Sequence, residues 1–290
     1  MRNFFVVFVV LIGIFTAVSC SNTTTPTETD KGEGITTFTV ATIDDWNSVK
    51  IKIASGGNNK NYIIKITDNI DNMPGSFEKA FGVVTGITVT ISGDYILSLQ
   101  GETSGSFLYI GNKQTVVMQD TDLKGNGSNG AKLVSINGGT FIMQGNASLS
   151  GNNGGGVRLS DESSFNMKDN TSVFGNMATY GGGVWVDGRG VFTMEGNAAV
   201  FGNTASIWGG GILINGGANG GVFRLAGGTV VGDNVYQGLP ANSAPAYSGT
   251  ALYVNGSAQV TYGGTDGTSF NIPLYNNAQN NTITHEGVKP

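Results

Sequence analysis

Two turns of this sequence hold the side chains best suited to do chemistry. Asp161 and Glu162 lie in one turn, and Asp187 lies in the corresponding turn of the next repeat. Arg158 and Arg189 are nearby. Two carboxylates brought together could act as general acid and base in sugar hydrolysis, or could hold calcium for a lyase. Acidic residues in turns are more often turn formers, so we expect no catalytic activity, metal or cofactor, with a polysaccharide lyase or hydrolase as the alternative.

Other signatures of catalysis or of nucleic-acid binding are weak. His285 is the only histidine, and it lies in the polar segment 276–290, which we expect to be a C-terminal tail. No Lys-Ser or Lys-Thr follows the glycine-rich segments, as a phosphate-binding loop would require. Only 12% of the residues are charged and the net charge is −5, whereas nucleic-acid binding needs clustered lysine and arginine. We expect no nucleic-acid partner.

The only cysteine, Cys20, is a candidate site of lipid attachment. The apolar run 4–18 is short for a membrane span and typical of a signal-peptide core. It ends in Ala17-Val18-Ser19-Cys20, which looks like a bacterial lipobox. We expect a signal peptide over residues 1–19, a palmitate-type anchor on Cys20, and a flexible polar tether over residues 20–35. An ordinary secretory signal with an unmodified cysteine is the alternative.

The elements that position the two turns are short repeated segments. Phe-x-Met begins at Phe141, Phe165 and Phe192 and returns as Phe-Arg-Leu at Phe223. Each copy continues with an apolar residue and then an asparagine, followed in three copies by a triple glycine and an alternating apolar triplet. The asparagines are Asn152, Asn176, Asn203 and Asn234, with Asn126 in a weaker copy. Such a regular period predicts one structural unit stacked on copies of itself.

The unit is predicted to be a coil of very short strands. Apolar residues alternate with polar ones in runs of a few residues, and Gly, Asn, Asp and Ser interrupt the runs. Strands this short need partners, and coils of about three strands stacked about 4.8 Å apart provide them. We predict an all-β, single-stranded, right-handed parallel β-helix over residues 61–275. Its inward-pointing residues would include Phe165, Met167, Val173, Val184 and Val186.

Two structural questions stay open at this point. The asparagines at the bends could form a hydrogen-bonded ladder between coils or could simply favour turns. A β-propeller is the main rival fold, although its blades usually need about 40 residues.

The middle residues of the alternating triplets are candidates for a binding face. They should point outward and stack into one row. The row would consist of Tyr109, Ser135, Arg158, Trp185, Leu213 and Tyr253. An exposed aromatic and apolar row can bind glycans or proteins, but surface aromatics can equally serve only to stabilise strands. Phe174 and Phe201 form a second pair whose direction the pattern leaves open.

Residues 36–60 are expected to cap the first coil. Thr42 or Asp44 could begin a short amphipathic helix that ends near Gly56-Gly57. The alternation over 49–53 also fits a strand. A cap is expected because an open first coil would expose strand edges that recruit other chains.

At this point the chain resembles a known group of proteins. Phe174-Gly175-Asn176, Phe201-Gly202-Asn203 and the triple glycines are similar to repeats of bacterial polymorphic outer-membrane and adhesin-like β-helix proteins, particularly lipoproteins of spirochaetes such as treponemes. The likeness covers roughly residues 107–254. The polymorphic proteins have Phe-x-x-Asn where this chain has Phe-x-Asn, and they end in a membrane barrel, whose anchoring role we expect lipid on Cys20 to fill.

This resemblance implies a place and an architecture more than an activity. It implies a bacterial cell-envelope protein, anchored by lipid at the outer membrane or cell surface. Its partners would be the membrane and a glycan or protein of a host or neighbouring cell. A polysaccharide-active enzyme and a coat protein without a specific ligand are the alternatives.

Overall fold

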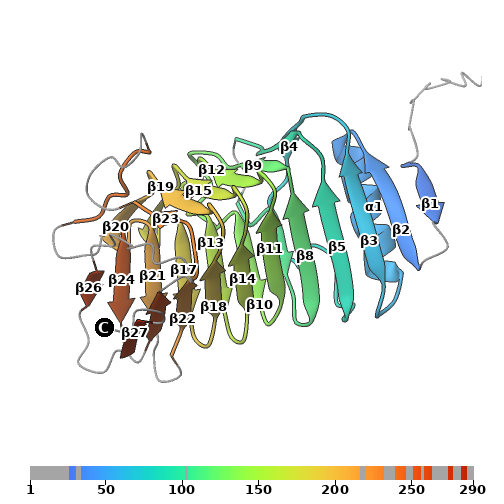
Figure 1. Cartoon of the computed structure of the whole chain (residues 1–290). Coiled ribbons are helices and arrows are strands. Elements are labelled where there is room, and N and C mark those ends of the chain that lie inside the picture. The colour runs from blue at the N-terminus through green and yellow to red at the C-terminus, as the bar shows by residue number, and fades with distance from the viewer. Residues whose placement is uncertain are drawn as a thin grey trace, which may run out of the picture.

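A computed structural model describes residues 26–30, 34–101, 104–215, 220–231, 239–245, 251–255, 258–262, 274–276 and 282–285. Over these residues the chain is a parallel β-helix of about seven turns with one short helix, drawn from the side in Figure 1. The predicted all-β solenoid is therefore confirmed. The predicted signal peptide, Cys20 and the first part of the tether lie outside the described residues.

Three sheets run along the rod, and their described strands pair in parallel except β1, which is antiparallel to β2. Sheet 1 contains β1 (Glu28–Asp30), β2 (Ile35–Val40), β3 (Asn61–Ile66), β5 (Ile87–Ser92), β8 (Gln114–Gln119), β11 (Thr140–Gln144), β14 (Ser164–Met167), β18 (Val191–Met194), β22 (Val222–Leu225), β25 (Gln259–Tyr262) and β27 (Thr282–His285). Sheet 2 contains β7 (Leu108–Ile110), β10 (Val134–Asn137), β13 (Val157–Ser160), β17 (Val184–Asp187), β21 (Ile212–Asn215), β24 (Leu252–Asn255) and β26 (Leu274–Asn276). Sheet 3 contains β4 (Ile70–Met73), β6 (Ile96–Leu99), β9 (Asp122–Lys124), β12 (Ser148–Ser150), β15 (Ser172–Phe174), β19 (Ala199–Phe201) and β23 (Thr229–Val230).

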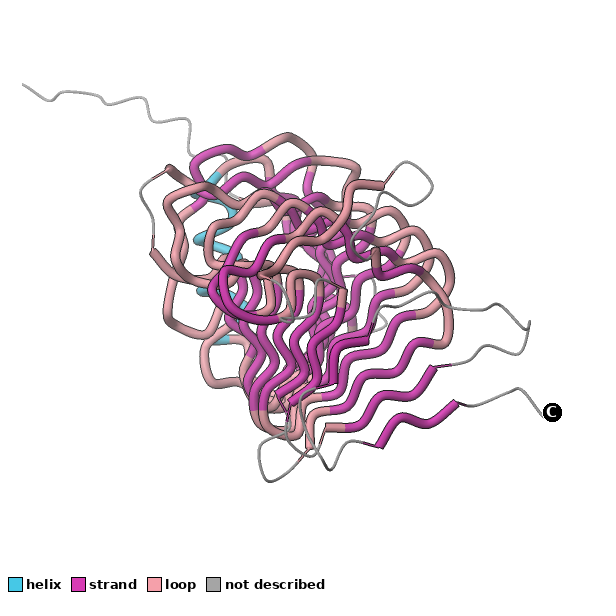
Figure 2. The backbone as a smooth tube through the Cα atoms, turned by 90° about the vertical axis from the view of Figure 1, so that its left-hand side faces the viewer, coloured by secondary structure: helices cyan, strands magenta, loops and turns pink. Residues whose placement is uncertain are grey.

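Two further strands form a small fourth sheet. β16 (Met177–Tyr180) pairs in parallel with β20 (Thr204–Trp208). A typical coil passes from sheet 2 to sheet 1 to sheet 3, as β10, β11 and β12 do, and the view along the rod in Figure 2 shows strands of successive coils one behind another. Equivalent residues are therefore direct neighbours in space.

The core is a set of stacked columns. Phe141, Phe165, Phe192 and Phe223 are fully buried, and neighbouring rings lie 5.3, 4.9 and 5.2 Å apart between centroids. Aromatic pairs at such distances add about 0.5–1.5 kcal/mol each beyond the apolar area that they bury. The inward positions predicted from the sequence are confirmed as buried: Phe165, Met167, Val173, Val184 and Val186.

A second column inside the coils is a ladder of buried asparagine amides. Asn176 and Asn203 each donate from backbone N–H and Nδ2 to the Oδ1 of the next rung, at 2.8–3.1 Å. Asn152 also donates its N–H to Asn176 Oδ1 at 3.1 Å. The rungs are Asn129, Asn152, Asn176, Asn203 and Asn242. Of the two roles that the sequence left open for the asparagines, the hydrogen-bonded ladder between coils is therefore the correct one.

Two rungs of the ladder differ from those read in the sequence. Asn126 was expected in the weaker coil, but its Nδ2 donates to Gln100 O at the surface, and Asn129 donates to Asn152 instead. Insertions of chain before the rung shift the register, so counting from the preceding apolar residue selects the wrong asparagine. The last predicted rung, Asn234, lies outside the described residues, and Asn242 bonds to Asn203.

The triple glycines make room for this ladder. A Cβ added at Gly183 would lie 2.9 Å from Asn203 Nδ2, and one at Gly211 would lie 2.7 Å from Asn242 Nδ2. Any side chain there would push the amides out of hydrogen-bonding position. The two motifs of the repeat, Gly-Gly-Gly and the buried asparagine, are therefore two halves of one packing arrangement.

The expected cap helix is present as α1 (Ile43–Ser55). Thr42 is its N-cap, and Thr42 and Asp45 form a reciprocal capping box with both bonds at 3.1 Å. Trp46, Val49 and Ile53 are buried against the first coils. Figure 1 places α1 at the N-terminal end of the rod.

Paired strands extend beyond two of the expected boundaries. β2 already pairs in parallel with β3, so the parallel sheet begins at Ile35 rather than at residue 61, and β1 covers its edge antiparallel. At the other end, β27 lies within the expected polar tail 276–290 but pairs in parallel with β25. Half of the residues in each strand are threonine, so neither strand stands out as apolar in the sequence, although Phe38 and Val40 of β2 are buried in the core.

Candidate ligand-binding groove

The predicted outward row lies on sheet 2. Register pairs Tyr109 with Ser135, Ser135 with Arg158, and Arg158 with Trp185, and continues to Leu213 and Tyr253. Tyr109, Arg158 and Trp185 are partly exposed. Leu213 and Tyr253 are only 3% and 1% exposed, so the expectation of an exposed row is wrong for these two residues.

The burial of the far end of the row has a local cause. The Trp208 ring, at the end of β20, lies parallel to the Tyr253 ring with centroids 5.4 Å apart. Gly209, directly after β20, packs so closely that an added Cβ would be 2.9 Å from the Leu213 Cα. Sequence reasoning did not assign β16 or β20. The sequence does indicate these two strands, because similar short segments, 177–180 and 204–208, follow Asn176 and Asn203.

Between Tyr109 and Arg158 the row is interrupted by the small side chain of Ser135, and a hollow of about 490 Å³ opens there. We call this hollow the sheet 2 groove. Ser76 pairs with Ser106 just before β7, which brings Ser76 and Phe77 to the rim on the Tyr109 side. The remaining lining residues include Asn137, Ser160, Asp161 and Asp187. The volume lies within the range of about 300–1,000 Å³ that is usual for ligand sites.

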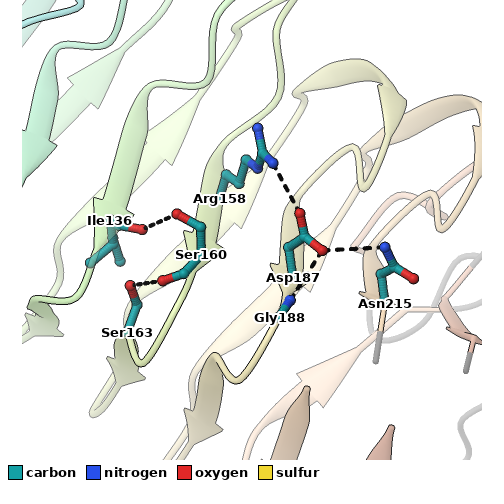
Figure 3. A network of polar contacts seen from close by, with 7 residues as sticks. All are labelled: Ile136, Arg158, Ser160, Ser163, Asp187, Gly188 and Asn215. Carbon is teal, nitrogen blue, oxygen red and sulfur yellow. Dashed lines mark hydrogen bonds and ion pairs between the residues drawn. The ribbon is translucent and has the colours of Figure 1, made fainter. Parts of the chain in front are cut away.

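One side of the sheet 2 groove is an ion pair. Arg158 Nη2 lies 2.9 Å from Asp187 Oδ2, and Figure 3 shows the arginine reaching along the sheet to this carboxylate. The other oxygen, Asp187 Oδ1, accepts from Asn215 Nδ2 at 3.2 Å and from Gly188 N–H at 3.0 Å. Asp187 is thus held by three donors in a fixed position.

The acidic turns found in the sequence meet at this groove. Asp161 and Asp187 both line it, as expected for stacked coils. Glu162 and Arg189 form a separate surface ion pair of 2.9 Å. Asp161 has φ +54°, in the left-handed region, and the next coil has Gly188 there with φ +59°. The turn conformation therefore accounts for the position of Asp161, while its carboxylate remains at the groove.

Below the ion pair lies a buried lysine that sequence reasoning missed. Lys132 Nζ donates to Tyr180 O at 2.8 Å and to Gly181 O at 2.6 Å. Trp185 lies near both cations, with Arg158 Cζ 4.4 Å and Lys132 Nζ 5.9 Å from its ring centroid. Burial, and secondarily the charge of Arg158, lowers the pKa of Lys132 to about 7. Gly155 provides the space, because a Cβ there would lie 2.3 Å from Nζ.

The outward aromatics of sheet 3 form a stack of their own. Phe174 and Phe201, whose direction the sequence left open, are half-buried and lie with ring centroids 5.0 Å apart and planes within 4°. Ser150 precedes Phe174 in this outward row.

Two further findings concern the described residues only. No group of three or more His, Cys, Asp and Glu side chains in them could hold a metal ion. None of the helices that the structure describes is both long and apolar enough to cross a membrane. The predicted lipid site, Cys20, and the side chain of His285 lie outside the described residues.

Comparisons with known proteins gave no match, whether to a family model, to a curated protein or to a solved structure. The classification of this chain therefore comes from its own register and burial, and it is a parallel β-solenoid protein.

Proposed function

We propose that this chain is a binding protein of the bacterial cell envelope, anchored by lipid at Cys20, with the sheet 2 groove as its ligand site. In this proposal it is an adhesin-like surface protein, similar to the spirochaete lipoproteins that its repeats resemble. Its ligands are a glycan or protein of a host or neighbouring cell. The observation that carries the proposal is the groove between Tyr109 and Arg158.

In this proposal the binding face contains fewer residues than the outward row that the sequence predicts. Leu213 and Tyr253 are packed beneath other residues and stabilise the rod. Tyr109 and Arg158, by contrast, line a hollow that a ligand can enter. Ser135 lies between them and is the smallest described residue of the row, which leaves space for a ligand.

The test is binding of the purified protein to arrayed glycans and matrix proteins. Tyr109→Ala and Arg158→Ala should each weaken binding at least about tenfold, the loss expected when a central contact is removed. Tyr95→Ala is the matched control, because Tyr95 is a partly exposed tyrosine in the turn before β6 and does not line the groove. Equal binding by the parent and both groove variants would refute the proposal.

The location is tested by treating intact cells with protease. A surface-exposed protein should be lost, and a variant with Cys20→Ser should appear in the medium or the periplasm rather than in the membrane fraction. Full protection of the parent in intact cells would contradict the adhesin-like part of the proposal.

A carbohydrate-active enzyme is the second candidate, favoured by the presence of Asp161 and Asp187 at one groove. It predicts release of new reducing ends or unsaturated sugars from polysaccharides, and loss of that release in Asp161→Ala. The leading proposal predicts no release. The Arg158 contact to Asp187 favours the binding function, because one of the two carboxylates is already engaged in an ion pair.

A further inference from the structure

We infer that the sheet 2 groove takes an uncharged sugar chain, in preference to an acidic polysaccharide. This inference rests on the proposed function and adds the chemical class of the ligand. It is carried by the way in which the charges of the groove are already engaged, and by the aromatic and hydroxyl groups that line the rest of the hollow.

Arg158 is the one cation among the described residues that line the groove, and it is poorly placed to bind an anion. Arg158 Nε is buried, so the guanidinium offers a ligand only its terminal nitrogens. One of these, Nη2, is held by Asp187 at 2.9 Å. Paired N–H bonds to a carboxylate or sulfate need two neighbouring nitrogens. An anion that used the remaining N–H groups of Nη1 and Nη2 would lie beside the Asp187 carboxylate, which two other donors also hold in place, and the two negative charges would repel.

The lining as a whole also disfavours negative charge. Among the described residues, its charged side chains are Arg158, Asp161 and Asp187, one cation against two carboxylates. The Asp161 carboxylate has no hydrogen-bond partner within the part of the chain that the structure describes. Like charges brought together without compensation repel. A uronate in this groove would face that carboxylate, whereas a sugar hydroxyl would donate a hydrogen bond to it.

The uncharged part of the lining suits a sugar ring. Tyr109 and Phe77 offer aromatic faces for the apolar C–H face of a sugar, and the Phe77 side chain is 69% exposed. Ser135 and Ser160 lie on adjacent strands with hydroxyls already oriented by Ser106 Oγ and Ile136 O. A hydroxyl that donates within the protein still accepts from a ligand. The groove thus combines acceptors, a terminal N–H donor and stacking faces.

The experiment is titration calorimetry of the full chain, purified in detergent, with sugar hexamers of equal length. The probes are hexamers of glucose, of N-acetylglucosamine and of galacturonate. At least one neutral hexamer should bind more tightly than the galacturonate hexamer. Its affinity should change less than about twofold when the ionic strength rises from about 0.05 to about 0.5 M, because screening acts on charged ligands.

A matched pair of variants locates the binding. Ser135→Trp fills the groove, and Ser150→Trp adds the same ring to an outward position of β12 on sheet 3. Ser135→Trp should weaken neutral-sugar binding at least about tenfold, and Ser150→Trp should not. Circular dichroism and melting establish that each variant is folded, and Tyr109→Ala replaces Ser135→Trp if the latter does not fold.

The outcomes separate this inference from the proposed function. Tighter binding of galacturonate, or no binding of any neutral hexamer, overturns the sugar class. The proposed function then still stands if the folded Ser135→Trp variant, or Tyr109→Ala in its place, loses binding to arrayed proteins or glycans. Sugar and array binding that both survive in that variant overturn the inference and the proposed function together.

Discussion

At the residue scale, Lys132 shows how a single side chain can be hidden from sequence reasoning. Nothing in Ala-Lys-Leu suggests a buried amine. The lysine is buried because Gly155 in the next coil lacks a side chain, which opens a channel toward two backbone carbonyls. Burial favours the neutral amine, whereas the two carbonyl acceptors favour the ammonium. Burial is the larger effect, and the pKa falls to about 7.

This lowered pKa makes stability depend on pH with a defined sign. Between pH 7 and the ordinary lysine value of 10.5, the unfolded chain keeps a proton that the folded chain has released. The free energy of unfolding should therefore rise with pH in this window, by up to about 1.4 kcal/mol per pH unit, and be flat below it. Lys132→Met should remove this contribution. The measurement is urea unfolding at several pH values for the parent and the variant.

Lys124→Met provides the control for this prediction, because Lys124 is exposed on β9. Its pH dependence should follow that of the parent. If Lys132→Met and the parent gave parallel curves from pH 7 to 10, the buried amine would not be titrating as described.

At the element scale, the asparagine ladder shows which stacked positions stabilise the coils. Asn176 is 1% exposed and bonds through its amide to Leu149 O, Phe174 O and Asn203 Oδ1. Asn170 belongs to a second asparagine ladder, which lies on the surface, and its Nδ2 donates to Asn146 Oδ1 at 3.2 Å. Water replaces lost bonds at the surface but not in the core, so the same residue type has different energetic weight at the two positions.

We expect Asn176→Ala to lower the free energy of unfolding by about 2–4 kcal/mol, because it leaves several buried polar groups without partners. Asn170→Ala should cost less than about 1 kcal/mol. Chemical denaturation of the two variants measures the difference. Similar losses for both would mean that the buried ladder is no stronger than the exposed one.

At the scale of the whole molecule, the repeat determines which residues stack on one another but not how exposed each of them is. The alternating triplets were sufficient to predict which residues stack, since Tyr109, Arg158 and Trp185 occupy equivalent positions. They could not predict how deep each one lies. The groove rim depends on Ser76, which returns to pair with Ser106 from an earlier coil, and the covering of Tyr253 depends on Trp208. Ser76 comes from a segment outside the repeat, whereas the segment that carries Trp208 resembles the one after Asn176 but was not assigned as a strand.

The same distinction explains the errors at the ends and in the ladder. Phe165 and Val184 were predicted to be buried because alternation fixes the face of a strand. Asn129 was missed because a loop that lengthens by a few residues changes the count without changing the fold. Strands such as β2 and β27 were missed because a terminal coil can be more polar than its neighbours.

In-register stacking can be tested by disulfide formation. Asn166 and Thr193 are partners on β14 and β18, and strands in one sheet lie about 4.8 Å apart, within the range that a disulfide spans. With Cys20→Ser present, Asn166→Cys and Thr193→Cys should join rapidly under mild oxidation. Asn166→Cys with Arg224→Cys, two strands apart, should not. Equal cross-linking of both pairs, read by mass spectrometry after proteolysis, would contradict the register.

The most direct test of the central claim, that the sheet 2 groove is the ligand site, is difference electron density from crystals of the chain soaked with a hexamer that it binds. The predicted result is density between Tyr109 and Arg158, with a ring against the tyrosine and hydroxyls within hydrogen-bonding distance of Asp161. Density for the bound hexamer on sheet 3 or at the Trp208 and Tyr253 stack, with the groove empty, would contradict the account.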